Sequence, residues 1–309
     1  MTEGPAVSEG AGEAGSHLGG LVGGLLKAMR PHQWVKQGFV VAPLVFAKGL
    51  GVPEMMLRSL GAAVSFSLAA SCIYLMNDIA DLEADRAHPT KRLRPIASGR
   101  VPVSVARVAM VVLGALALAG SAFLGWKTLA VVVGYIALQI AYTFRLKRIA
   151  YVDVLCIAAG FEFRVLAGSY ALGVTPSNYL LAVTLLLSLF LGFGKRMHEL
   201  RQGKRATQQR SALGHYSERS LTVLLQMTAL ATTGTYVIYT LDPRTRAAFG
   251  TDYLAGTIVF AEFGILRFLD LIRNATDAAS PTEQMLKDWP FLLNLVLWAI
   301  AVVVVIYVS

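Results

Sequence analysis

Four side chains with carboxylate or amide oxygens lie close together in the first third of the chain: Asn77, Asp78, Asp81 and Asp85. If this stretch is helical, a rotation of about 100° per residue puts the three aspartates on one face and Glu83 away from it. Carboxylates held this close repel one another unless a cation lies between them. Mg²⁺ prefers such oxygen ligands, combined with the phosphate oxygens of a substrate. The spacing therefore predicts a Mg²⁺ site, with the aspartates as catalytic residues and Asn77 as a neutral ligand.

A basic loop bounded by prolines follows this acidic segment. It contains Lys91, Arg92 and Arg94 between Pro89 and Pro95, and such cations are suited to bind phosphate oxygens. A mixture of Asp and Lys is also typical of a solvated loop that only orients a protein. The shared face of the three aspartates favours the first interpretation, a site for a phosphorylated substrate.

The elements that must position this site are strongly apolar. Of the 309 residues, 55% are hydrophobic and 15% are charged, whereas about a quarter are charged in a typical soluble domain. A helix needs about 20 apolar residues to cross a bilayer, so the sequence predicts an all-α, polytopic membrane protein of about nine transmembrane helices. The apolar runs lie near 36–51, 57–77, 102–125, 127–144, 151–173, 178–195, 219–240, 253–273 and 289–308, and Pro43 interrupts the first.

The net charge of +9 does not indicate nucleic-acid binding, because the Lys and Arg residues lie in short loops between apolar runs. They concentrate on one side of the predicted bundle, at 30–36, 91–100, 145–148 and 195–210. Loops rich in Lys and Arg usually stay on the cytoplasmic side of a membrane, so this side of the bundle, including the acidic site, is predicted to face the cytoplasm. Residues 1–17 are predicted to be a disordered tail without signal-peptide features, and residues 18–309 a single transmembrane domain that begins with an interfacial helix.

The acidic and basic segments together resemble a known motif. The pattern Asn-Asp-x-x-Asp-x-x-x-Asp-Arg-x-x-His-Pro-x-Lys-x-x-Arg-Pro, from Asn77 to Pro95, is similar to the first aspartate-rich motif of the UbiA superfamily of membrane prenyltransferases. The resemblance implies a UbiA-like helical bundle and a Mg²⁺-dependent enzyme. About nine spans fit that fold.

Further segments resemble one branch of the superfamily, the decaprenyl-phosphate phosphoribosyltransferases. These are Arg30-Pro-His-Gln-Trp-Val-Lys36, the His-Pro-Thr-Lys-Arg-Leu-Arg-Pro form of the loop, Arg164, and Gly194-Lys-Arg-Met-His-Glu-Leu200. The resemblance implies transfer of 5-phosphoribose from phosphoribosyl pyrophosphate to a polyprenyl (decaprenyl) phosphate, with release of pyrophosphate, in the synthesis of cell-wall arabinan precursors. It also implies a multi-pass protein of a bacterial inner (plasma) membrane.

Several polar residues outside the acidic segment are predicted to bind substrate. Arg164 lies about three helical turns beyond Asp153 inside an apolar run, where a cation usually marks a functional site, although it could pair with an acid of another span. Glu199 follows Lys195 and Arg196 by four and three residues and so can hold either cation. The predicted binding residues are Lys36, Lys91, Arg94, Tyr142, Lys147, Arg164, Lys195, Arg196, Glu199 and Tyr216. Tyr142 is equally compatible with an interfacial aromatic belt, and the resemblance implies that Tyr216 is part of a lid.

Two other functions remain open at this stage. A UbiA-type prenyltransferase would ionise a prenyl diphosphate for attack by an aromatic acceptor, but the stretch 145–153 offers only Asp153 among three cations instead of a second acidic loop. A transporter would carry ionisable residues near the middle of several spans, whereas here they cluster at one mouth. The sequence leaves both a monomer and a homo-oligomer open.

Overall fold

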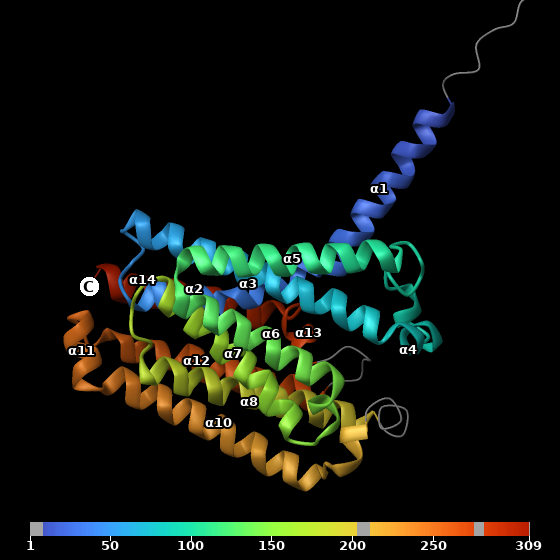
Figure 1. Ribbon diagram of the computed structural model, residues 1–309. Coiled ribbons are helices and arrows are strands. Elements are labelled where there is room, and N and C mark those ends of the chain that lie inside the picture. The colour runs from blue at the N-terminus through green and yellow to red at the C-terminus, as the bar shows by residue number, and fades with distance from the viewer. Residues whose placement is uncertain (1–8, 203–210, 275–280, 309) are drawn as a thin grey trace, which may run out of the picture.

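The computed structural model describes residues 9–202, 211–274 and 281–308. Over these residues the chain forms helices joined by short connections and contains no strand. The long helices lie side by side in one bundle, and α1 (Glu9–Met29) projects from one end of it (Figure 1). The predicted all-α class is confirmed.

In the described part of the chain, nine helices make up the bundle and shorter helices connect them. The bundle helices are α2 (Gly38–Phe46), α3 (Pro53–Ala80), α5 (Val103–Leu124), α6 (Trp126–Phe144), α7 (Val152–Ala171), α8 (Asn178–Arg201), α10 (Glu218–Leu241), α12 (Ile258–Arg273) and α14 (Trp289–Val308). The connecting helices are α4 (Leu82–Ala87), α11 (Pro243–Phe249) and α13 (Pro281–Met285), with the 3₁₀ helices η1 (Pro31–Gln37), η2 (Lys91–Leu93), η3 (Leu146–Arg148), η4 (Ser211–His215) and η5 (Tyr253–Thr257).

The predicted count of nine spans is not confirmed. Among the described residues, six helices are long and apolar enough to cross a membrane: α3, α5, α6, α8, α10 and α14. The run predicted at 36–51 divides into η1 and α2, which contains Pro43 and has only 9 residues, about 14 Å of helix against a bilayer core of about 30 Å. Helix α12 has 16 residues, fewer than the roughly 20 that a spanning helix needs.

The N-terminal segment also differs from expectation. Helix α1 covers the predicted interfacial helix but already begins at Glu9, inside the stretch predicted to be a disordered tail. Residues 1–8 of that predicted tail lie outside the described part of the chain.

The centre of the bundle is built on α3, which packs against α2, α5, α6 and α7. Its buried face contributes Phe66 and Ile73 to a core shared with Val132 of α6 and Ala167 of α7. Helices α2 and α7 approach each other closely, because a Cβ atom built at Gly168 would lie 1.9 Å from the Val40 carbonyl oxygen. A small residue thus brings α2 into the bundle, as at many membrane-helix contacts.

The two ends of the bundle have different contents. Helix α4 lies at one end, whereas α11 and the C-terminus lie at the other (Figure 1). The α4 end also gathers the end of α6, the start of α7 and η4, since η3 contacts α6, α7 and η4. Loops that are far apart in sequence therefore meet at the end of α3 that carries the acidic segment.

Candidate active site

The acidic segment is a broken helix. Helix α3 ends at Ala80, Asp81 caps it with a φ of −96° and ψ of 13°, and α4 begins at Leu82. The backbone N–H of Asp81 still donates to the Asn77 carbonyl (2.9 Å), and that of Asp85 donates to the Asp81 carbonyl (2.8 Å). The expected continuous helix is thus interrupted at its middle aspartate, which separates the environments of the three carboxylates.

Asp78 and Asp85 are buried and face the same arginine. Nη1 of Arg94 lies 3.2 Å from Oδ1 of Asp78 and 2.6 Å from Oδ2 of Asp85. Arg30 adds a second cation, with its Nη2 2.5 Å from the same Asp78 oxygen. Arg30 has a left-handed backbone (φ 56°) at the junction of α1 and η1, and its guanidinium stacks 5.0 Å from the ring centre of Tyr74. The basic loop and the end of α1 thus neutralise both buried acids.

Asp81 and Asn77 face α6 and the turn that follows it. Nζ of Lys147 lies 3.0 and 3.2 Å from the two carboxylate oxygens of Asp81, which is the most exposed of the three aspartates. The Thr143 hydroxyl donates to the amide oxygen of Asn77. Each of the three aspartates is therefore paired with a cation, and Asp78 and Asp85 share Arg94.

A cleft opens directly beside this cluster. It has a volume of about 330 Å³ and is lined by Lys27, Ala28, Arg30, His32, Gln33, Asp78, Thr90, Leu93, Arg94 and Pro95. Its polar lining is predominantly cationic, and Asp78 forms part of its wall. Such a cleft is suited to an anionic ligand that reaches the carboxylates.

The donors present fit a divalent cation. Among the described residues, no three or more His, Cys, Asp or Glu side chains form a ready metal-binding group. However, the Arg94 nitrogen already lies between the Asp78 and Asp85 carboxylates, so a positive charge is accommodated there. Oxygen donors around that point, with Asn77 and Asp81 adjacent, match the ligand preference of Mg²⁺.

A second ionic cluster, buried at Arg196 and Asp153, lies at the same end of the bundle. Nε of Arg196 is 3.1 Å from Oδ2 of Asp153, and its Nη1 pairs with Glu199. The Tyr216 hydroxyl donates to Oδ1 of Asp153 (2.5 Å) and accepts from the backbone N–H of Tyr151 (2.7 Å). Burial, then the hydrogen bond to Asp153, raise the pKa of the Tyr216 hydroxyl. The cluster ties α7, α8 and the segment after η4 together.

Arg164 lies deeper, on α7. Its guanidinium carbon is 5.0 Å from the ring centre of Phe66 and 5.3 Å from those of Tyr135 and Phe161. Its Nη1 donates to the carbonyl of Gly160 at 2.7 Å. A purely structural arginine would pair with an acid on another span. No such acid pairs with Arg164 among the described residues.

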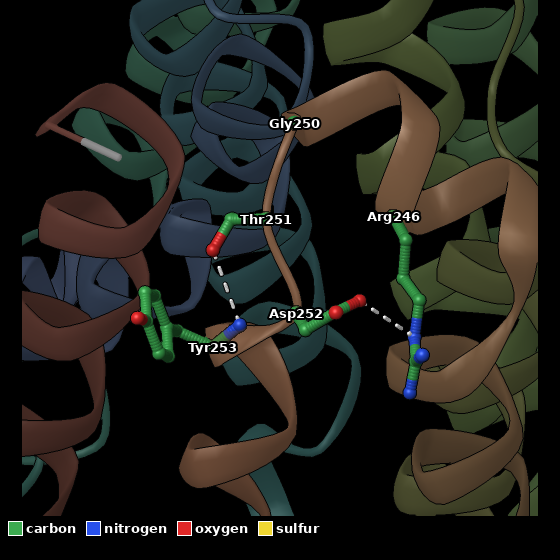
Figure 2. A pocket seen from close by; sticks show the side chains of 5 residues that line it. All are labelled: Arg246, Gly250, Thr251, Asp252 and Tyr253. Carbon is green, nitrogen blue, oxygen red and sulfur yellow. Dashed lines mark hydrogen bonds and ion pairs between the residues drawn. The ribbon is translucent and has the colours of Figure 1, made fainter.

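A larger cavity, of about 380 Å³, lies at the opposite end of the bundle and is lined by Arg246, Gly250, Thr251, Asp252 and Tyr253 (Figure 2). Arg246 reaches across it to Asp252, with Nε 3.2 Å from Oδ1. Both side chains are substantially exposed. The charge of this cavity is balanced at its surface, so we assign the site to the cleft beside Asp78.

Comparison with known proteins shows the family of this chain. Residues 38–296 match the model of the UbiA prenyltransferase family. The chain belongs to this family. It is 36% identical over 283 residues to the decaprenyl-phosphate phosphoribosyltransferase of Mycobacterium tuberculosis, covering 90% of this chain and 92% of the relative. The Mycolicibacterium smegmatis enzyme of the same name is 37% identical over 303 residues, or 94% of both chains.

The fold is also found in solved structures of the family. A UbiA homolog from Archaeoglobus fulgidus, bound to DMAPP and Mg²⁺, superimposes with a TM-score of 0.69 at 17% identity, covering 92% of this chain and 99% of the other. The predicted UbiA-like bundle is therefore confirmed. The family and its phosphoribosyltransferase members make this protein an enzyme, a transferase.

The structure brings only part of the predicted binding set to the acidic segment, and of that set only Arg94 lines the cleft. Arg94 and Lys147 contact the acids directly, and Lys91 begins η2 in the same basic loop. Arg196 and Glu199 pair with each other, as their spacing indicated. The Arg196 side chain has 0% exposure and two carboxylate partners. Its geometry therefore favours holding the end of α8 against the start of α7 over direct phosphate binding.

Sequence reasoning missed Arg30 as a member of the acid cluster. Arg30 was recognised only as the first residue of the Arg30 to Lys36 segment. Spacing alone does not show that the left-handed turn after α1 directs its guanidinium toward Asp78. Thr143 was also missed, since a threonine near a helix end has no distinctive pattern. Lys36, Tyr142 and Lys195 stay predictions as substrate-binding residues.

Proposed function

We propose that this protein transfers 5-phosphoribose from phosphoribosyl pyrophosphate to a polyprenyl phosphate such as decaprenyl phosphate, with Mg²⁺ and with release of pyrophosphate. The two mycobacterial relatives that bear the name decaprenyl-phosphate phosphoribosyltransferase support this choice. Such a transfer supplies a lipid-linked pentose for cell-wall arabinan.

The pairing of acids with cations is the observation that carries the proposal. Asp78, Asp85 and Asp81 are held by Arg30, Arg94 and Lys147. The three carboxylates would hold a divalent cation that accompanies the donor, and Arg30, Arg94 and Lys147, once released from them, would bind the donor's phosphates. Phosphoribosyl pyrophosphate carries a diphosphate and a second phosphate, so it uses more cations than a prenyl diphosphate does.

The bound metal would supply charge neutralisation at the diphosphate, which lowers the barrier to its departure. Asp78 and Asp85 would hold it, with Asp81 and Asn77 as neighbouring donors. Arg94 and Lys147 then turn toward the diphosphate oxygens and stabilise the negative charge that grows on them as the C1–O bond breaks. Lys91, in the same loop, adds a further cation for the phosphates.

The acceptor needs positioning more than activation. A polyprenyl phosphate is already an anion at neutral pH, so its oxygen attacks the oxocarbenium-like C1 without a general base. Lys36 lies at the start of the bundle and is a candidate to attract this headgroup, with the isoprenoid tail against the helices. No residue has to form a covalent intermediate.

The location of the reaction follows from the charge distribution. We propose that η1 together with α2, and also α7 and α12, cross the bilayer beside the six helices that are long and apolar enough to do so, which gives nine spans. The end with α4, η2 and η3 then faces the cytoplasm, where the water-soluble donor is present. The membrane is taken to be a bacterial inner membrane, and a homo-oligomer is compatible with this arrangement.

Product identification tests the proposal. Purified protein is incubated with Mg²⁺ and decaprenyl phosphate, and with either phosphoribosyl pyrophosphate or geranyl diphosphate, and the lipids are analysed by mass spectrometry. We expect a phosphoribosyl lipid and pyrophosphate from the first donor alone. A prenylated product from geranyl diphosphate and an aromatic acceptor, without any phosphoribosyl lipid, would replace our assignment with a UbiA-type prenyltransferase.

A further inference from the structure

Arg164 differs from the other buried charged side chains of the described chain. Asp78, Asp85, Asp153 and Arg196 are each buried and each form an ion pair. Arg164 is 5% exposed, its Nε has no hydrogen-bond partner, and no carboxylate of the described residues pairs with it. Because a guanidinium stays charged even when buried, an uncompensated one is costly inside a membrane bundle.

The surroundings of Arg164 stabilise its charge but leave one of its buried donors without a partner. The rings of Phe66, Tyr135 and Phe161 cover its faces at cation–π distances. Nη1 donates to the Gly160 carbonyl, whereas the buried Nε has no acceptor among the described residues. A planar guanidinium edge is the geometry that binds two oxygens of a phosphate.

A second buried polar group without a partner lies on the segment that packs against the rings around Arg164. Gln37 is 5% exposed, and neither its amide oxygen nor its amide nitrogen has a hydrogen-bond partner. It lies two residues before Phe39, whose ring packs 4.9 Å from that of Phe161, one of the rings around Arg164. Unsatisfied buried amides are uncommon and call for a ligand or a water.

Arg164 lies on the membrane side of the acid cluster. The Arg164 side chain bends back toward the start of α7, since it bonds the carbonyl four residues earlier, and α7 begins beside η3, which carries Lys147. Asp78 lies near the end of α3, and Tyr74, one turn deeper, stacks against Arg30. The unpaired cation therefore points toward the reaction centre from inside the bundle.

We propose that Arg164, assisted by Gln37, binds the phosphate of the lipid acceptor. This inference rests on the proposed function and assigns its acceptor subsite. The leaving diphosphate is bound at the mouth by the acids and their cations, so an incoming oxygen reaches C1 from the opposite face, which is the side of Arg164. The lipid phosphate oxygen forms the new bond to C1, the bond from C1 to the diphosphate breaks, and its electron pair leaves with pyrophosphate. The 5-phosphate of the donor belongs to a water-soluble molecule, and the exposed cations at the mouth can bind it.

Binding measurements on the full-length protein separate acceptor from donor. Arg164→Met keeps the length of the side chain and removes its charge, and Arg164→Lys restores a charge without the fork. Arg58→Met is the matched control, because Arg58 pairs with Glu54 at an exposed site in the first turns of α3, far along that helix from Asp78. Thermal protection is measured with decaprenyl phosphate, with decaprenol, and with phosphoribosyl pyrophosphate plus Mg²⁺. The KM for each substrate is measured in parallel.

We expect Arg164→Met to raise the KM for decaprenyl phosphate by about 10- to 100-fold, the effect of losing a charged hydrogen bond. Its protection by phosphoribosyl pyrophosphate should stay unchanged. Arg164→Lys should lie between, Gln37→Leu should raise the acceptor KM by roughly tenfold, and decaprenol should protect no variant better than another. Loss of donor protection with an unchanged acceptor KM would assign Arg164 to the 5-phosphate and overturn the inference. Unfolding of both Arg164 variants, or no effect of either, would overturn it as well.

The binding arm keeps this test apart from that of the proposed function. If no phosphoribosyl lipid forms at all, the proposed function fails. Selective protection of the wild-type protein by decaprenyl phosphate over decaprenol, lost in Arg164→Met, would still support the acceptor subsite.

Discussion

Replacing Arg94 with methionine isolates the charge that joins the two buried carboxylates. Arg94 is the ionic partner of Asp85 among the described residues, whereas Asp78 keeps Arg30. Losing one partner of a buried pair costs about 3–5 kcal/mol, but the Arg94 side chain is 32% exposed, and solvent screening reduces this value. We therefore expect a loss of about 2 kcal/mol, a decrease in Tm of roughly 4–8 °C.

Magnesium should reverse much of this loss in the variant. Without Arg94 the two carboxylates face each other with an open position between them, which a divalent cation can take. Binding at concentrations tenfold to 100-fold above Kd stabilises the folded state by about 1.4–2.7 kcal/mol. In the wild-type protein, Mg²⁺ alone should change Tm little, because Arg94 already holds that position, and phosphoribosyl pyrophosphate should be needed together with the metal.

The assay is thermal unfolding in detergent, followed by tryptophan fluorescence, with EDTA or with increasing Mg²⁺. Arg86→Met is the control, since Arg86 forms an exposed ion pair with Glu83 on the same short helix and should give less than about 0.5 kcal/mol. Equal Mg²⁺ responses of Arg94→Met and wild type would contradict a cation position between Asp78 and Asp85. An Arg94→Met variant as stable as Arg86→Met would contradict the bridging role itself.

Three further outcomes are expected. Asp81→Asn should lower kcat by at least about 100-fold, and Tm should be nearly unchanged because the Asp81 side chain is 42% exposed. The control variant Glu83→Gln should retain activity. Equal activities of the two variants would remove Asp81 from the site. Gly168→Ala should destabilise by about 2–3 kcal/mol in denaturant unfolding, since the new Cβ meets a backbone carbonyl, while Gly234→Ala, which meets nothing within 4 Å, should not; similar midpoints would contradict the close α2–α7 contact. A cysteine at Lys91 should be protected from an impermeant thiol reagent in whole cells and one in the α7–α8 loop should be labelled, and the reverse pattern would place the site outside.

Much of this protein could be predicted from the order of its residues. The runs of about 20 apolar residues determine long helices, because every backbone polar group in a bilayer must be satisfied within its own segment. The acidic motif and its basic loop are contiguous, so local spacing identified the end of α3 as the site. The pairing of Arg196 with Glu199 is a helical neighbour contact, and it was predictable for the same reason.

Only the tertiary structure decided how charges from distant segments combine. Arg30 reaches Asp78 across 48 positions and Lys147 reaches Asp81 across 66, and no periodicity encodes such pairs. The division of the first apolar run also escaped the sequence, because η1, Pro43 and the short α2 are accommodated by packing against α7 through Gly168. The surroundings of Arg164 and Arg196 also differ, although both are buried arginines. Aromatic rings surround Arg164, whereas two carboxylates pair with Arg196, because long-range packing determines which groups each cation meets.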